Sequence, residues 1–165
     1  MEQDRKLKIV FGLSLIGLLI ATYQTYDYYF GLAICSGDSV FSCALVTESA
    51  YGSLPPNSGI ATALWGAVWW IGMLTITGIS LRKPGQWLTD VFFVLFVMSL
   101  GGVVVTGYLV FVELYLLPAE TGQLAICPFC TAQHILIVTI AALSYTMLEE
   151  PFTETLHVWY RSLIR

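Results

Sequence analysis

Four cysteines stand in two pairs, and the spacing of both pairs is typical of thiol–disulfide chemistry. Cys127 and Cys130 form a Cys-x-x-Cys motif directly before a long apolar run. Such a pair can close a small disulfide ring, and the free N–H groups and partial positive charge of a helix N-terminus stabilise a thiolate. The same motif is compatible with a fixed disulfide or with half of a zinc site. The other pair, Cys35 and Cys43, encloses seven residues.

The elements that carry these cysteines are predicted to be membrane helices. Of the 165 residues, 57% are hydrophobic and only 11% are charged, and the mean hydropathy is +0.77. A membrane core of about 30 Å takes roughly 20 residues of helix. The sequence therefore predicts an all-α integral membrane protein, a four-transmembrane-helix bundle that forms one domain, residues 1–150. The predicted spans are residues 7–26, 60–81, 90–117 and 126–147.

The distribution of charge predicts the orientation of this bundle. All seven Lys and Arg residues lie before the first span, between the second and third spans, or after the fourth. The connections 30–59 and 118–125 contain neither residue type, so the positive-inside rule predicts both termini in the cytoplasm and both connections at the extracytoplasmic face. All four cysteines then lie at that face, where thiols are readily oxidised. No basic patch indicates nucleic acid as a partner.

Two segments outside the spans have predicted structures of their own. The extracytoplasmic loop 30–59 is long for a helix connection, and long loops tend to be functional. Within it, residues 41–46 are apolar enough to predict a short helix that covers the bundle like a lid, and residues 54–59 end any helix there. After the fourth span, residues 149–151 are predicted to end the helix. Residues 151–165 then form a cytoplasmic amphipathic tail on the membrane surface.

Several side chains inside the predicted spans also bear on function. Glu113 is an ionisable residue in an apolar run, and an intramembrane carboxyl is costly enough to be a functional candidate. The alternative is that Glu113 reaches the membrane interface, because it lies near the outer end of its span. The second span contains three tryptophans, which are expected to pack and to anchor the helix at the interface: Trp65, Trp69 and Trp70.

The two cysteine pairs together suit an electron relay. A loop disulfide can oxidise a soluble dithiol protein and pass the electrons to an embedded pair by thiolate attack. The embedded pair then needs an acceptor that dissolves in lipid, and a quinone is apolar and takes two electrons. His134 follows Cys130 by four residues and Cys127 by seven, so the three share one helix face. A donor there can serve a quinone oxygen or a thiolate, or be satisfied by backbone or water.

The order and spacing of these features resemble the vitamin K epoxide reductase family, including its bacterial quinone-linked members. The resemblance extends over residues 7–147. Another type of quinone-linked oxidase also has four helices and two cysteine pairs, but its Cys-x-x-Cys comes first, whereas here it comes second. The matching features are Cys35 and Cys43, Ser49 six residues later, Gly59-Ile60 at the start of the second helix, and Cys127-Pro128-Phe129-Cys130 before the fourth.

The resemblance implies a role for each matched residue. Cys35 would meet a thioredoxin-like periplasmic or extracellular protein. Cys43 would exchange with Cys127, and Cys130 would be the thiolate that faces the quinone. Ser49 would position the loop. The resemblance thus implies a membrane thiol oxidoreductase that supports extracytoplasmic disulfide formation, in a prokaryotic plasma membrane rather than the endoplasmic reticulum.

Two positions differ from the family pattern and bear on the substrate. Thr62 stands where a quinone-contacting amide is common, and His134 stands where the animal enzymes have a tyrosine. Simple reduction of a quinone, whether ubiquinone, menaquinone or a vitamin K type, is therefore favoured over epoxide reduction, and this function needs no metal. Three alternatives stay open: an animal-type vitamin K quinone or epoxide reductase, a non-enzymatic membrane protein with two structural disulfides, and a four-cysteine zinc module, which an oxidising compartment disfavours.

Overall fold

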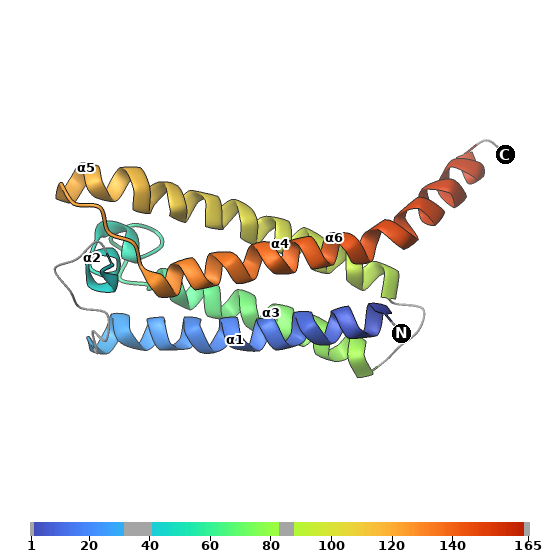
Figure 1. Cartoon of the computed structure of the whole chain (residues 1–165), viewed down its shortest axis with the longest axis horizontal. Helices are drawn as coiled ribbons and strands as arrows, with labels where there is room; N and C mark the ends of the chain where they lie inside the picture. The colour runs from blue at the N-terminus through green and yellow to red at the C-terminus, as the bar shows by residue number, and fades with distance from the viewer. Residues whose placement is uncertain (1, 32–40, 83–87, 164–165) are drawn as a thin grey trace.

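The protein is described by a computed structural model that covers residues 2–31, 41–82 and 88–163. The four long helices of the described residues run side by side along the longest axis of the molecule (Figure 1). They are α1 (Glu2–Phe30), α3 (Thr62–Arg82), α4 (Leu88–Phe111) and α6 (Pro128–Leu163). The shorter elements are α2 (Cys43–Thr47), the 3₁₀ turn η1 (Ala50–Gly52), the π-helical turn η2 (Val112–Leu116) and α5 (Leu117–Thr121).

Each long helix contributes a stretch that is apolar and long enough to cross a membrane. The predicted all-α membrane bundle of four spans is therefore confirmed. The first span starts earlier than predicted, since α1 already begins at Glu2. An ion pair between Lys8 Nζ and Asp4 Oδ2, 2.6 Å long and one helical turn apart, supports this charged start of the helix. The third span is composite, since α4, η2 and α5 follow one another directly. The four stretches are Gln3–Phe30, Thr62–Arg82, Val91–Thr121 and Pro128–Leu148.

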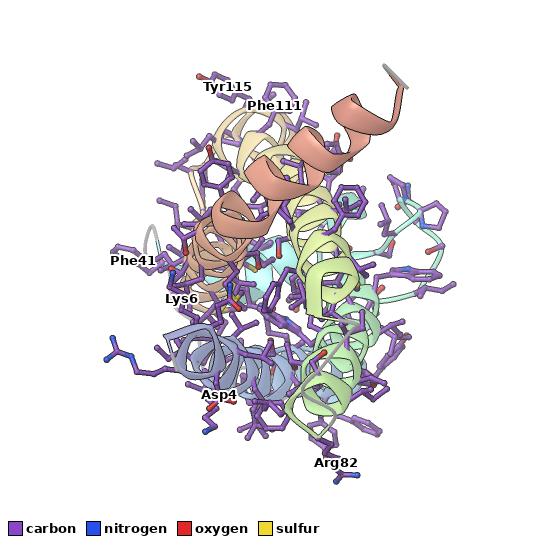
Figure 2. The ribbon with its side chains drawn as sticks, turned by 90° about the vertical axis from the view of Figure 1, so that its right-hand side faces the viewer. Asp4, Lys6, Phe41, Arg82, Phe111 and Tyr115 are labelled. Atoms are coloured by element: carbon purple, nitrogen blue, oxygen red, sulfur yellow. The ribbon has the colours of Figure 1, made fainter. Side chains whose placement is uncertain are left out.

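The helices pack around a mostly apolar interior. α1 packs against α3 and α6, and α4 packs against α6 and α3. Figure 2 shows this arrangement along the bundle axis. Trp70, Met73, Leu95 and Ile140 are fully buried between the helices. Many other large apolar side chains, such as that of Val104, point outward and are exposed, as expected for helices that face lipid.

The close approach of α1 and α3 depends on Gly17. A Cβ atom at this position would lie only 2.3 Å from Cε2 of Trp70. The missing side chain of Gly17 therefore makes the space in which the indole lies. Small residues at helix contacts are the usual way for membrane helices to approach closely.

The two ends of the bundle carry different groups. Both termini lie at one end (Figure 1), together with the start of α1, which carries Lys6, and the end of α3 at Arg82. α2, α5 and the first turn of α6 lie at the opposite end (Figure 1). Cys43, Cys127 and Cys130 therefore share one end of the molecule. That this end meets the extracytoplasmic face remains a prediction.

The end of the fourth helix differs from the prediction. The sequence predicts a stop at residues 149–151, but α6 continues through Pro151 to Leu163. Proline lacks the N–H that would bond to the carbonyl four residues earlier, and its ring crowds that carbonyl, so it kinks a helix when both flanks stay helical. The last part of α6 accordingly turns away from the bundle (Figure 1). The division into residues 1–150 and 151–165 remains a prediction.

Candidate redox site

The Cys-x-x-Cys motif lies where α6 begins. Cys127 directly precedes the helix and is fully buried, while Cys130 lies in the first turn and is half-buried. The backbone N–H of Cys130 donates to Cys127 Sγ at 3.4 Å, so a free N–H of the helix start points at the sulfur. The pKa of Cys127 is lowered to about 6, chiefly by hydrogen bonding with the Cys130 thiol. The N–H groups of this turn act in the same direction, and burial opposes them.

The second sulfur at this site comes from α2. Cys43 is the first residue of α2 and is buried. The side chain of Ser42 caps the helix by accepting from the Leu45 N–H at 3.3 Å. The Sγ atoms of Cys43 and Cys127 lie 3.3 Å apart. A short helix is therefore present in the predicted place, although it runs from Cys43 to Thr47 and not over residues 41–46 because Ser42 caps its start, and it brings a loop cysteine to the Cys-x-x-Cys motif. Cys35, the other loop cysteine, lies outside the described residues.

Ser49 and Thr62 join the loop to the bundle. Ser49 donates to the Val46 carbonyl at 2.8 Å and accepts from the Tyr51 N–H at 3.3 Å, so it ties the end of α2 to η1. Thr62, the first residue of α3, donates to the Tyr51 carbonyl at 3.2 Å. The backbone of Tyr51 thus connects the loop that carries Cys43 to α3: its N–H donates to Ser49, and its carbonyl accepts from Thr62.

A cavity of about 490 Å³ opens beside Cys130; α3, α4 and α6 supply most of its wall, and α1, α2, η1 and η2 also contribute to it. This volume is within the range of small-molecule sites. Cys130 lines the cavity, whereas Cys127 does not. The two sulfurs of the motif therefore have different neighbours, one facing Cys43 and the other facing the cavity. Most of the wall is apolar and aromatic, with Trp65, Trp69, Met98, Val105, Leu109 and Ile137 among its residues.

Three polar side chains that the sequence singles out line the cavity: those of Thr62, Glu113 and His134. Glu113 is only 6% exposed and lies beside the Cys130 thiol and the backbone of Cys127, so its carboxyl points into the bundle. It lies in the π-helical turn η2, and such turns are frequent at functional sites. His134 is 9% exposed and lines the cavity. Its imidazole makes no hydrogen bond within the described part of the chain, so its N–H is available to a ligand.

Three further residues connect to the motif, and sequence reasoning missed their role. Gln24 of α1 donates from Nε2 to Cys130 Sγ at 3.2 Å and to Cys127 Sγ at 3.7 Å. Gln133 Nε2 donates to Gln24 Oε1 at 2.7 Å. Trp70 Nε1, which was expected only to pack or anchor, donates to Gln133 Oε1 at 2.6 Å. Both glutamines lie inside predicted spans, where a search for uncharged polar residues would have selected them.

A comparison with protein-family models matches residues 8–145 to the vitamin K epoxide reductase family. The match covers most of the chain. The chain belongs to this family. A comparison with curated proteins gives no match. Membership identifies the chain as an integral membrane oxidoreductase that links thiols to quinones, in a family generally associated with thioredoxin-like partners.

The cavity fits the quinone that vitamin K epoxide reductase family members use. Aromatic and aliphatic walls suit a flat apolar ring and its hydrocarbon tail. His134 offers a donor for a ring oxygen, and the Cys130 sulfur lies on the same surface. The site therefore combines an apolar space with one cysteine sulfur and a small number of polar groups.

Proposed function

We propose that this protein is a quinone-linked thiol oxidase that supports extracytoplasmic disulfide formation. Two electrons would pass from a thioredoxin-like dithiol protein through Cys35 and Cys43 to Cys127 and Cys130, and then to a quinone. The proposal is supported chiefly by the different surroundings of the two cysteines in the motif. Cys127 Sγ lies 3.3 Å from Cys43 Sγ, whereas Cys130 lines the apolar cavity.

The first exchange reduces the embedded pair. The partner's dithiol becomes a disulfide as it reduces the Cys35–Cys43 disulfide. The Cys43 thiolate attacks Cys127 Sγ, the Cys127–Cys130 bond breaks, and its electron pair stays on Cys130 as a thiolate. Cys35 then attacks Cys43, and Cys127 leaves as a thiolate. The lowered pKa of Cys127 suits this last step, because a thiol of lower pKa leaves faster.

The second exchange oxidises the embedded pair again. Cys127 and Cys130 form a disulfide and release two electrons and two protons, which together convert a quinone to a quinol. The Glu113 carboxylate, beside Cys130 and the backbone of Cys127, is placed to take a thiol proton. His134 is placed to donate to a quinone oxygen from the wall of the cavity. The apolar lining keeps water away from the thiolate while these transfers occur.

The orientation and the substrate type complete the proposal. The positions of the basic residues support cytoplasmic termini, with the cysteine end at the periplasmic or extracellular face of a prokaryotic plasma membrane. Residues 151–165 are proposed to lie on the cytoplasmic surface. His134 in place of a tyrosine, and Thr62 in place of an amide, support simple quinone reduction over epoxide reduction. Ubiquinone, menaquinone and vitamin K quinones all remain within this proposal.

The test measures quinol formation by the full-length protein in lipid vesicles. A reduced thioredoxin-like protein is the electron donor, and a soluble quinone of each type is the acceptor. We expect steady quinol formation by the parent and none by Cys130→Ser. Thr22→Val is the matched control, because Thr22 is a membrane-helix residue whose hydroxyl, among the described residues, bonds only to the Leu18 carbonyl of its own helix, at 2.8 Å.

Three outcomes would overturn the proposal. Absence of quinol formation by the parent with every quinone would leave a protein with static disulfides. Faster turnover of a vitamin K epoxide than of any quinone would favour the animal-type activity. A normal rate for Cys130→Ser would remove the assigned role of the cavity sulfur.

A further inference from the structure

We propose that Gln24 is a catalytic residue whose amide stabilises the Cys130 thiolate, and that Gln133 and Trp70 are positioning residues that hold this amide the right way round. The inference rests on the proposed function for the role of Cys130. It extends that function by assigning a donor on α1 that the cysteine motif does not reveal. The hydrogen bonds run from Trp70 on α3 to Gln133 on α6, then to Gln24 on α1, and end at the two sulfurs.

The direction of these hydrogen bonds follows from the chemistry of the Trp70 indole. An indole N–H can only donate, so the atom of Gln133 that faces Trp70 at 2.6 Å must be its carbonyl oxygen. The amide nitrogen of Gln133 then faces Gln24 at 2.7 Å, and the atom it meets must be the Gln24 carbonyl oxygen. The nitrogen of Gln24 is therefore left facing the sulfurs. A glutamine amide alone has no such preference, because its two ends are nearly the same shape.

The surroundings make this orientation important. Gln24 is 7% exposed, Gln133 is 9% exposed and Trp70 is fully buried, so these hydrogen bonds are shielded from bulk water, and their open side faces the mostly apolar cavity. A thiolate in such a place needs a donor from the protein, and a hydrogen bond to a charged acceptor is roughly twice as strong as a neutral one. If the amide turned over, its oxygen would face the sulfur and oppose the negative charge. The indole N–H prevents that turn.

The position of the Gln24 amide also suits both stages of the relay. Its nitrogen carries two hydrogens and lies 3.2 Å from Cys130 Sγ and 3.7 Å from Cys127 Sγ. One residue can therefore stabilise charge on Cys130 while Cys127 is bonded to Cys43, and on Cys127 when that bond breaks.

Gly17 keeps Trp70, the first donor in this series of hydrogen bonds, in place. Gly17 lies seven positions before Gln24, on the same face of α1, and provides the space for the Trp70 indole. A side chain at Gly17 would push the indole away from Gln133. α1 thus supplies both the donor to the sulfur and the gap that fixes the direction of that donor.

The test measures ionisation of Cys130 without quinone or partner. The full chain carries Cys35→Ser, Cys43→Ser and Cys127→Ser, so that Cys130 is the remaining thiol, and its alkylation by iodoacetamide is followed over a range of pH. Adding Gln24→Leu should slow alkylation at pH 7 about tenfold or more and move the profile to higher pH, as expected for loss of one hydrogen bond to a charged group. At a pH that ionises the thiol fully, the rates should agree, which excludes a change in access.

Further variants separate the donor from its supports. Gln133→Leu and Trp70→Phe should move the profile in the same direction by a smaller amount, because Gln24 stays present but is free to turn. Thr22→Val should leave the profile unchanged. If Gln24→Leu does not fold, Trp70→Phe decides, since it keeps an aromatic ring and removes only the indole donor.

An unchanged profile in Gln24→Leu, or in Trp70→Phe where that variant decides, would overturn the inference. An equal shift in Thr22→Val would do the same, because it would reveal a general change of the bundle. Since the assay contains no quinone, a parent protein that fails to reduce quinones would contradict only the proposed function. The profile shift would then still assign Gln24 as the donor to Cys130.

Discussion

Buried polar side chains find their hydrogen-bond partners in different places in the two halves of the bundle. In the half near the termini, buried hydroxyls bond to their own helix: Ser14 donates to the Val10 carbonyl at 2.7 Å, and Thr77 donates to the Met73 carbonyl at 2.7 Å. In the half near the cysteines, Gln24, Glu113 and Gln133 reach across helices to the sulfurs or to each other.

The difference follows from side-chain length and has a functional meaning. A short hydroxyl reaches the carbonyl one turn earlier and needs no other partner, so it can be buried anywhere along a membrane helix. An amide or carboxyl in the same place has more groups to satisfy and is costly without partners across the bundle. Gln24 and Glu113 contact the Cys-x-x-Cys motif directly, and Gln133 reaches it through Gln24. Cross-helix hydrogen bonding by amide and carboxyl groups therefore distinguishes the half near the cysteines from the half near the termini, where Ser14 and Thr77 bury hydroxyls instead.

The largest effect is expected from Cys43, which connects the loop to the Cys-x-x-Cys motif. Cys43→Ser should reduce quinol formation driven by a reduced thioredoxin-like protein to the background rate, because the sulfur that faces Cys127 at 3.3 Å is removed. Quinol formation driven by a small membrane-permeant dithiol should persist, since that reagent can reduce Cys127 and Cys130 directly. Equal loss with both reductants would place Cys43 in the quinone site itself.

A smaller but still large effect is expected from Glu113. Glu113→Gln keeps the shape of the side chain but removes its capacity to accept a proton, and general-base catalysis typically contributes about 10²–10⁴-fold. We expect quinol formation with the permeant dithiol to fall by about 10²-fold. Glu120→Gln is the matched control, because Glu120 lies in the same span but is exposed. A rate for Glu113→Gln close to that of Glu120→Gln would return Glu113 to a structural role.

His134→Phe should have an intermediate effect that is confined to the quinone. The ring is kept and one donor is lost, so we expect quinone affinity or reduction rate to fall about tenfold, the size of one hydrogen bond to a developing charge. Disulfide exchange between the loop pair and the partner protein should not change. Quinone kinetics within about twofold of the parent would show that His134 only lines the cavity.

The smallest effect is expected in the half near the termini. Ser99 donates to the Leu95 carbonyl at 2.6 Å and lies 3.5 Å from Ser144 Oγ, in a layer that reaches no sulfur. Ser99→Ala should lower the free energy of unfolding by about 1 kcal/mol and leave quinol formation within about twofold of the parent. Both quantities can be measured on one preparation. A large loss of activity without loss of stability would contradict the division between the halves.

Much of the architecture was predictable from local features of the sequence. Four spans follow from hydropathy and helix length, and the short helix near Cys43 follows from apolar residues in a long loop. The shared face of Cys130 and His134 follows from helical spacing. Each of these depends on residues that are close together in the chain, so no knowledge of the packing is needed. The continuation of α6 past Pro151 was not predictable in this way. Whether a helix ends at a proline or only kinks there depends on whether the residues on both sides stay helical.

The contacts between helices were decided only by the tertiary structure. Cys43 and Cys127 are 84 residues apart, and Gln24 and Cys130 are 106 apart, yet both pairs are in contact. Whether such side chains meet depends on how far each helix is rotated and shifted against its neighbours. Those quantities are set by packing at places such as Gly17, where a single Cβ atom would displace Trp70. Hydropathy reports which residues avoid water, but not which of them face each other, so the chain from Trp70 to the sulfurs emerges only when the helices are packed.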